Sequence, residues 1–183
     1  MKCSLLGGLA VAIVSSVASS IASADVVVSF TNFSANGFQF TQLASPGSLT
    51  GTLTGVSVNA VLNASVGFTY ADDLCVYVDV LPLSTAGMVQ IGGYSDLGAA
   101  QRYYWPSGGS DAVGTAVTGD VTFITPINIS TPNLAIWLGN GYGAAGTSGT
   151  WTGSVTLIGV NQVPAPGAIA LLAVAGLVSR RRR

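Results

Sequence analysis

The sequence predicts an all-β domain in the middle of the chain, with the architecture of a β-sandwich or jelly roll. Short runs rich in valine, threonine and aromatic residues recur along the chain, and these residue types favour strands. Glycine-rich segments separate the runs, as expected of tight turns. No amphipathic helical pattern occurs between Asp25 and Gln162, so strands at this spacing indicate packed sheets.

The expected strands are residues 25–33, 52–62, 74–80, 88–91, 120–124, 134–138 and 151–160. In residues 74–80 apolar side chains occupy every second position, which predicts a half-buried strand. Cys75 lies in this run and is expected to be a buried thiol, since the chain has no histidine to activate it. In residues 52–62 the alternation changes phase at Gly55, and a glycine at such a point is typical of a β-bulge.

Two segments of the domain are alike. Residues 51–63 and 149–161 both open with Gly-Thr-x-Thr-Gly and both end in asparagine. A structural repeat would explain this likeness, but nothing else recurs at that spacing. We therefore interpret the segments as two similar strands in a chain rich in threonine, glycine and valine.

The first 24 residues have the pattern of a secretory signal peptide. Lys2 gives a short positive region, residues 5–17 are apolar, and residues 22–24 form an Ala-x-Ala cleavage site. We expect residues 1–24 to form a signal helix that is removed on export, and Asp25 to begin a mature domain at 25–161. Cys75 would then be the single cysteine, which leaves no intramolecular disulfide.

The last segment, residues 162–183, has a second targeting pattern. An apolar run at 168–178 is followed by the arginines Arg180, Arg181, Arg182 and Arg183. The run is about half the length that a membrane-spanning helix needs, and the prolines before it would set the start of a short hydrophobic helix. Arginines at its end favour the cytoplasmic side. We expect transient membrane insertion during export, with a permanent anchor as the alternative.

This tail resembles a PEP-CTERM sorting signal in the order of its parts. The motif consists of Val163, Pro164, Ala165, Pro166 and Gly167, so that the usual Pro-Glu-Pro is Pro-Ala-Pro here. The resemblance implies export by a Gram-negative-type bacterium, with signal peptidase and a membrane exosortase as processing partners. It implies a location in the cell envelope, at the cell surface or outside the cell.

A second resemblance concerns the fold of the middle. The dipeptide Asp72-Asp73 leads into a strand, residues 137–143 read W-L-G-N-G-Y-G, and residues 149–157 read G-T-W-T-G-S-V-T-L. This order is similar to the galactose-binding-like sandwich of the convertase P-domain. The resemblance implies a jelly roll and carries over no catalytic residue.

The middle of the chain is acidic and nearly free of cations. Residues 25–163 contain Arg102 as their only basic residue and seven aspartates, with no Glu, Lys or His, which gives a formal charge of −6. Such a surface does not attract phosphates, so nucleic acid is not an expected partner. A neutral polar ligand such as a polysaccharide, or a calcium ion, suits it better.

The sequence offers little for catalysis, and we do not expect an enzyme. General acid–base catalysis usually relies on His, Glu, Asp, Lys or Cys, and only aspartates and one thiol are present after processing. Residues 141–146 match G-x-G-x-x-G, but the helix and acidic residue of a dinucleotide site do not follow, so we expect a flexible hairpin loop. A glycosidase needs two carboxylates at a set separation; the carboxylates open to that role are Asp72, Asp73, Asp96 and Asp111.

Two groups of residues are candidates for ligand binding. Asp72 and Asp73 would hold calcium together with backbone carbonyls, or would cap a turn. Tyr104 and Trp105 would form a sugar-stacking platform on a loop. Alternation equally predicts that Trp105 turns into the core while Tyr104 points outward. No other cofactor is expected.

These observations lead to two hypotheses of function. The first is an exported structural protein of the cell envelope or extracellular matrix, sorted by its C-terminal tail. The alternative is an extracellular module that binds carbohydrate or calcium through Tyr104, Trp105, Asp72 and Asp73. Both hypotheses require export.

Overall fold

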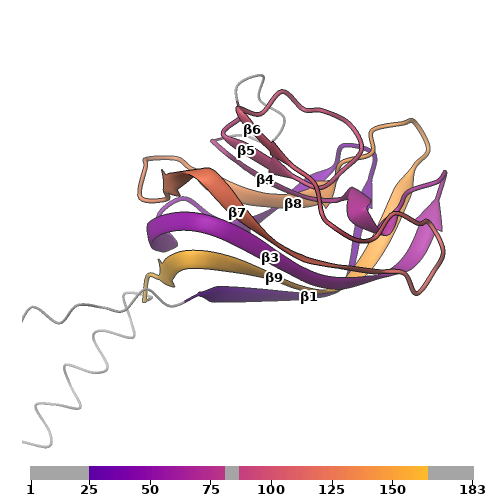
Figure 1. The fold of residues 1–183 in the computed structure, drawn as a ribbon, viewed down its shortest axis with the longest axis horizontal. Helices are drawn as coiled ribbons and strands as arrows, with labels where there is room; N and C mark the ends of the chain where they lie inside the picture. The colour runs from indigo at the N-terminus through magenta and orange to yellow at the C-terminus, as the bar shows by residue number, and fades with distance from the viewer. Residues whose placement is uncertain (1–24, 81–86, 165–183) are drawn as a thin grey trace, which may run out of the picture.

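The computed structural model describes residues 25–80 and 87–164, and this part of the chain forms two facing β-sheets (Figure 1). The expected all-β sandwich is therefore confirmed for the described domain. The single helical element in these residues is a 3-10 turn, η1 (Ala71–Asp73). The strands are β1 (Val26–Asn36), β2 (Phe40–Ala44), β3 (Leu49–Val66), β4 (Leu74–Asp79), β5 (Val89–Ile91), β6 (Gln101–Tyr103), β7 (Ala116–Asn128), β8 (Ala135–Asn140) and β9 (Ser148–Gln162).

Several expectations concern residues outside the described ranges. They are the signal helix at 1–24, the apolar helix at 168–178, the motif residues Ala165, Pro166 and Gly167, and the arginines Arg180, Arg181, Arg182 and Arg183. Within the described ranges, no helix has the length and apolar character needed to cross a membrane.

Each sheet combines strands from distant parts of the chain. The first sheet has the order β1-β9-β3-β7, and the second has the order β2-β8-β4-β5-β6. Neighbouring strands are antiparallel except β5 and β6, which run parallel. Most successive strands alternate between the sheets, so the connections gather at the two ends of the sandwich. Loops on such a rigid scaffold often carry function.

The two similar segments of the sequence form neighbouring strands. β3 and β9 pair over almost their whole length, from Leu49 opposite Gln162 to Val66 opposite Ser148. The register of β3 shifts at Gly55, which confirms an irregularity where the alternation changes phase. A Cβ atom at this position would lie 2.4 Å from the carbonyl oxygen of a residue in β7, so a larger side chain does not fit this close contact between strands.

The core lies between the sheets and is built from alternating side chains. Leu53 is buried before the irregularity in β3, and Val56 and Val58 are buried after it on the opposite parity. Trp151 of β9 is fully buried in the same apolar layer. The phase change thus keeps apolar side chains facing the core on both sides of Gly55.

The strand β4 is buried on both faces, so the expectation of a half-buried strand is wrong. Every residue of β4 is buried, because this strand lies in the middle of the second sheet and other segments cover its outer face. The ring of Tyr77 contacts that of Phe40 at 6.1 Å between centroids, and Gly141 packs against Cys75. Cys75 is a buried free thiol, as predicted, and burial raises its pKa to about 12.

Two short strands were not predicted from the sequence. β2 has five residues and β6 has three, and each lies at an edge of the second sheet. Runs this short give no readable alternation. All seven expected strands are present, with ends that differ from the prediction by a few residues.

Candidate functional site

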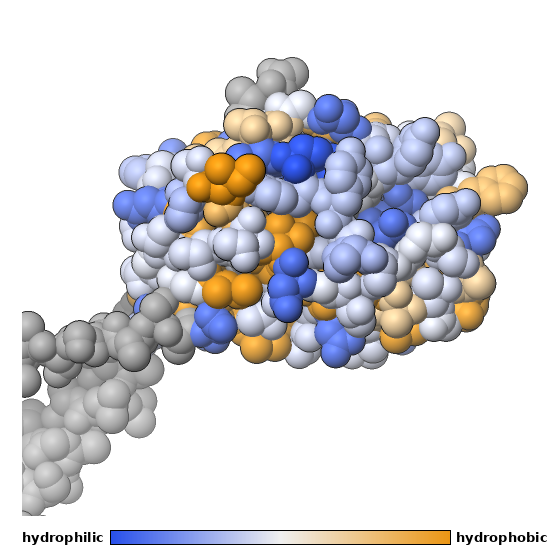
Figure 2. Space-filling view, viewed as in Figure 1, coloured by the Kyte–Doolittle hydropathy of each residue, from blue (hydrophilic) through white to orange (hydrophobic). Residues whose placement is uncertain are grey.

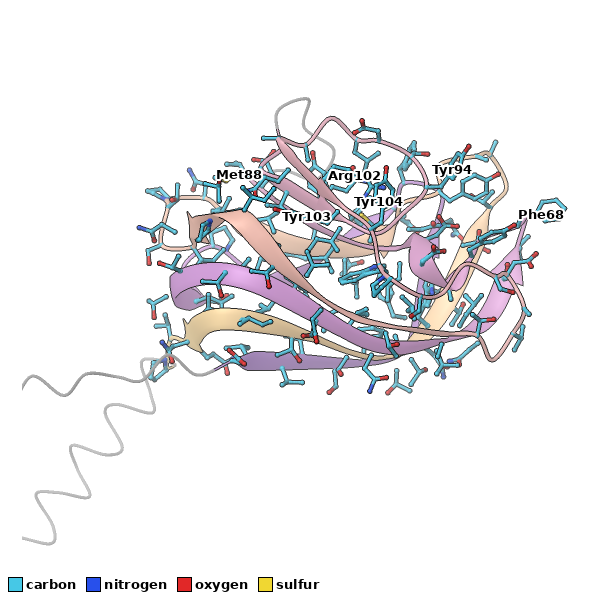
Figure 3. The ribbon with its side chains drawn as sticks, in the orientation of Figure 1. Phe68, Met88, Tyr94, Arg102, Tyr103 and Tyr104 are labelled. Atoms are coloured by element: carbon cyan, nitrogen blue, oxygen red, sulfur yellow. The ribbon has the colours of Figure 1, made fainter. Side chains whose placement is uncertain are left out.

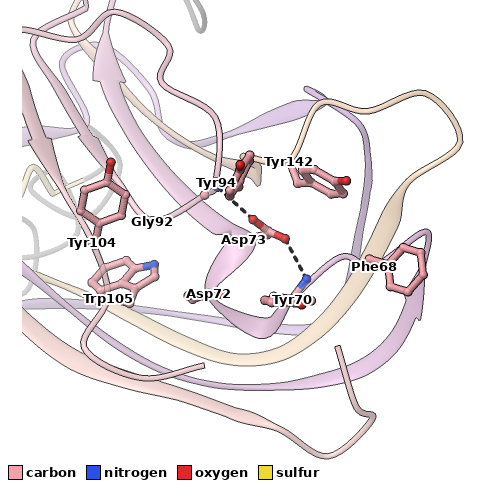
Figure 4. Close-up of a pocket in the computed structure, with 10 residues that line it drawn as sticks. Phe68, Tyr70, Asp72, Asp73, Gly92, Tyr94, Tyr104, Trp105 and Tyr142 are labelled. Carbon is pink, nitrogen blue, oxygen red and sulfur yellow. Dashed lines mark hydrogen bonds between the residues drawn. The ribbon is translucent and has the colours of Figure 1, made fainter. Parts of the chain in front are cut away.

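An aromatic cleft of about 430 Å³ lies at one end of the sandwich (Figure 4). It forms where the connection from β3 to η1 meets the segments that follow β5, β6 and β8. All of its lining residues are aromatic, aspartate or glycine: Phe68, Tyr70, Asp72, Asp73, Gly92, Gly93, Tyr94, Tyr104, Trp105 and Tyr142. We call this set the aromatic cleft.

The aromatic cleft brings together the two groups of candidate residues. Asp72 and Asp73 lie in η1, whereas Tyr104 and Trp105 follow β6, and all four line the same volume. Tyr104 is 66% exposed and Trp105 only 5% exposed, which is the inward and outward arrangement that alternation predicts. Trp105 therefore belongs to the core and also forms part of the cleft wall.

Asp73 joins two walls of the aromatic cleft. Its Oδ2 accepts a hydrogen bond from the backbone N–H of Tyr70 at 2.7 Å, and its Oδ1 accepts one from the backbone N–H of Tyr94 at 2.9 Å (Figure 4). Burial raises the pKa of Asp73 to about 6; the two hydrogen bonds oppose this rise and the neighbouring Asp72 adds to it. The carboxyl group is thus committed to holding the connection before η1 against the segment after β5.

Asp72 contributes its backbone to the same arrangement and leaves its carboxylate in the cleft. Its N–H donates to the carbonyl of Gly108 at 3.1 Å, and its carbonyl accepts from the N–H of Gly93 at 2.8 Å. The side chain is only partly buried, and this burial raises the pKa of Asp72. Of the two carboxylates, that of Asp72 is the more accessible to a ligand.

Two tryptophans bind the backbone of η1 and of the first residue of β4. The indole Nε1–H of Trp151 donates to the carbonyl of Ala71 at 3.1 Å, and that of Trp105 donates to the carbonyl of Leu74 at 2.7 Å. Gly92 lies against this second contact with φ +74, and a Cβ there would lie 2.2 Å from Trp105 Nε1. Glycine is required there both for the left-handed backbone and for the space.

Arg102 holds the segment after β5 against the end of β6. Its guanidinium donates to the backbone carbonyls of Gly92, Gly93 and Tyr103, and its central carbon lies 4.1 Å from the centroid of the Tyr104 ring. The one cation of the described residues is therefore bound to backbone and ring (Figure 3). The sequence shows its isolation but not this role.

Four aromatic residues of the cleft were not candidates from the sequence: Phe68, Tyr70, Tyr94 and Tyr142. Tyr94 is 79% exposed, and its ring meets that of Tyr142 edge to face at 5.9 Å. Phe68 is 74% exposed with φ +62, a backbone conformation that is unusual for a bulky residue and often occurs at functional sites. Figure 3 shows Phe68 at the far end of the molecule. The available signal for Tyr94 and Tyr142 is their position shortly after the predicted strands 88–91 and 134–138. Phe68 and Tyr70 lie between two predicted strands and carry no such signal.

The glycine-rich segment at residues 141–147 lies beside the aromatic cleft. It lacks the helix that a dinucleotide-binding site needs after its glycines. It leads directly from β8 into β9 with no helix between them. These strands belong to different sheets, so the expected hairpin is wrong and the segment is a crossing connection. A Cβ at Gly141 would lie 2.5 Å from the Cα of Gly93, so this glycine permits two backbones to touch beside the cleft.

The positions of the carboxylates give little support to a calcium site or to a glycosidase site with paired carboxylates. Among residues 25–80 and 87–164, no group of three or more His, Cys, Asp or Glu could share a metal ion. Both oxygens of Asp73 already accept amide hydrogen bonds. Asp96 and Asp111 do not line the cleft, and Asp96 accepts the N–H of Gly98 at 2.8 Å.

The proline motif begins at the opposite end of the sandwich. Val163 donates its N–H to the carbonyl of Ser48 at 2.9 Å, and a second cleft there is lined by Asp25, Val163 and Pro164 among others. β3 runs from this end to the aromatic cleft, and its 18 residues correspond to roughly 50–60 Å. The two described ends of the chain therefore lie together and far from the candidate site.

Searches with this chain found no matching protein-family model, no matching curated protein and no matching solved structure. The function is therefore inferred from the aromatic cleft and from the sequence patterns.

Proposed function

We propose that this chain is an exported protein of the cell envelope or extracellular matrix whose β-sandwich binds carbohydrate in the aromatic cleft. The observation that supports this most is the convergence of Tyr94, Tyr104 and Trp105 with the carboxylates of Asp72 and Asp73 around one volume. Sugars present apolar C–H faces to aromatic rings and hydroxyl groups to carboxylates. A mostly apolar pocket with a few convergent polar groups is a typical small-molecule site.

The charge of the cleft argues for a saccharide over a phosphate ligand. Asp72 and Asp73 disfavour a nearby phosphate, and Arg102, the cation closest to them in the described chain, donates to backbone carbonyls instead. Calcium fits less well than a sugar, because it takes six to eight oxygen ligands and Asp73 is already engaged. We do not propose an enzymatic activity.

The targeting part of the proposal comes from the two ends of the sequence. A signal peptide at 1–24 and the PEP-CTERM-like tail at 162–183 account for export and sorting by signal peptidase and an exosortase-like enzyme. The domain geometry supports this, because Asp25 and Pro164 lie at the end remote from the aromatic cleft. A tail held in the membrane would leave the cleft facing away from the membrane surface.

The finer architecture we propose is a jelly roll with one added edge strand. The orders β1-β9-β3-β7 and β2-β8-β4-β5 support it, since eight strands arranged as two Greek keys define that fold. β6 pairs parallel to β5 at the edge and is the addition. Its position matters for function because Tyr104 and Trp105 follow it directly.

A structural role in the matrix is the second candidate. Its support is the outer face of the first sheet, where Ser57, Asn59, Thr152, Ser154 and Thr156 carry polar, uncharged side chains at alternate positions of β3 and β9. Figure 2 views the sandwich from the side, where weakly polar residues surround an apolar area. The polar outer face of the first sheet suits a hydrated polysaccharide environment without a specific ligand.

A glycan array with the mature domain separates the two candidates. We expect binding to at least one saccharide class, and loss of that binding in the double variant Tyr94→Ala, Tyr104→Ala. Ile124→Ala is the matched control, because Ile124 is 88% exposed and lies outside the cleft. An array without hits would favour the structural role.

The targeting proposal has an independent test. Mass spectrometry of the protein from its native host should detect neither residues 1–24 nor the C-terminal arginines. An intact C-terminus would contradict the sorting-signal proposal and favour a permanent membrane anchor.

A further inference from the structure

The aromatic cleft has the electrostatics of a site for a positively charged group. Asp72 and Asp73 are the charged side chains in its lining. Arg102 is the single cation in residues 25–80 and 87–164, and it lies behind the cleft wall, where its guanidinium bonds the carbonyls of Gly92 and Gly93. A ligand cation would therefore meet two acidic groups, while the nearest basic group is already paired with backbone oxygens.

The backbone N–H donors of the segment after β5 are already engaged within the protein, so a ligand meets the side chains of the lining. The backbone N–H of Gly93 donates to the carbonyl of Asp72, and the N–H of Tyr94 donates to Asp73. The carbonyl of Gly92 already accepts from Arg102. The carboxylate of Asp72 is the strongest acceptor left to a ligand, and an ammonium group offers three donors to it.

The aromatic rings complement the same charge. The negative face of an aromatic ring attracts a cation held within about 6 Å of its centroid. Arg102 already makes this contact with Tyr104 at 4.1 Å. The rings of Tyr94 and Tyr142, which meet edge to face, and the indole of Trp105 remain as cleft walls. They suit both the C–H face of a sugar and an ammonium group beside it.

We propose that the aromatic cleft selects a saccharide that carries a protonated amine, an amino sugar without its acetyl group, over neutral and anionic sugars. This inference rests on the proposed carbohydrate binding and names its ligand class. The ammonium group lies against the carboxylate of Asp72, and the pyranose ring stacks on the aromatic wall. A neutral sugar gains the stacking but leaves the acidic pair without a counter-charge, and a uronate adds a further negative charge beside the pair.

Four hexasaccharides test this selectivity: β-1,4-linked glucosamine, N-acetylglucosamine and glucose, and galacturonate. Calorimetry with the mature domain at pH 6 should give about tenfold tighter binding of the glucosamine hexamer than of the acetylated one, which corresponds to about 1.4 kcal/mol. Galacturonate should not bind. Raising the salt concentration should weaken the binding of the glucosamine hexamer selectively, because salt screens exposed charges.

Two variants test the two parts of the site separately: Asp72→Asn tests the contact with the ammonium group, and Tyr94→Leu tests the stacking of the sugar ring. Asp72→Asn keeps the shape and should reduce the glucosamine preference to near parity, while Tyr94→Leu should weaken all hexamers together. Equal binding of the glucosamine, N-acetylglucosamine and glucose hexamers by the native domain, or preferential binding of galacturonate, overturns the inference and leaves carbohydrate binding in place. No binding of any hexamer, with a folded domain, counts against the proposed function itself.

Discussion

Asp73 of η1 and Tyr94 of the segment after β5 are joined by a hydrogen bond of 2.9 Å between the carboxylate Oδ1 and the backbone amide. The other oxygen, Oδ2, holds the amide of Tyr70 at 2.7 Å. One buried side chain therefore sets the distance between two walls of the aromatic cleft. Its loss should affect the cleft more than the sandwich, whose core lies between the sheets.

The variant Asp73→Ala tests this relationship. It removes both acceptors and leaves two backbone amides without their partners, which costs about 1–3 kcal/mol of unfolding free energy. Urea unfolding at pH 5 measures the loss, and amide hydrogen exchange should show faster exchange at Tyr70 and Tyr94. Asp96→Ala is the control, since Asp96 accepts one N–H in an exposed loop. Unchanged protection of the Tyr94 amide would contradict the role we assign to Asp73.

The pH dependence of stability gives a second test of the same carboxyl group. The pKa of Asp73 is about 6 in the folded protein against an ordinary value of 3.8, and that of Asp72 is also raised. Between about pH 4 and pH 6 the folded state therefore binds more protons than the unfolded state, so stability falls as the pH rises. We expect the unfolding free energy to be roughly 1–2 kcal/mol higher at pH 4.5 than at pH 7. Urea denaturation at both pH values measures it, and Asp73→Ala should flatten the slope.

Much of the sandwich follows from local patterns in the sequence. The runs that became β3, β4 and β9 are long or strongly apolar, and the phase change at Gly55 marks the irregularity that the pairing shows. The double burial of β4 was missed because alternation reports only one covered face. What covers the other face of β4, such as Phe40 and Gly141, comes from distant parts of the chain.

The parts of the aromatic cleft were visible in the sequence, but their convergence was not. Asp72, Asp73, Tyr104 and Trp105 stand out as local clusters, whereas Tyr94 is an isolated aromatic residue. The convergence depends on β6 pairing parallel to β5, which brings both following segments to the end where η1 lies. A three-residue edge strand gives no pattern from which that pairing could be predicted.

Gly92→Ala should disrupt the cleft from within its wall. The new methyl group would lie 2.2 Å from Trp105 Nε1 and 2.3 Å from the carbonyl of Leu74, at a backbone φ of +74. Strain and displacement of the indole should together cost about 2 kcal/mol or more. Gly109→Ala is the matched control, because a Cβ there has no atom within 4 Å. Thermal unfolding and near-ultraviolet circular dichroism compare the two, and equal melting temperatures would refute the tight packing at Gly92.

Arg102→Lys separates the charge of this residue from its geometry. The lysine keeps a positive charge, but its ammonium group cannot reproduce the planar fork that donates to the carbonyls of Gly92, Gly93 and Tyr103. We expect a loss of about 2 kcal/mol in unfolding free energy, since hydrogen bonds from charged groups contribute about 1.5–3 kcal/mol each. The free energy of saccharide binding should decrease by more than the unfolding free energy does, because Tyr104 loses the guanidinium that lies over its ring. Urea unfolding and calorimetric titration measure the two effects on one preparation. A lysine variant with native affinity would show that positive charge alone is sufficient, and that the fork of Arg102 does not position the cleft.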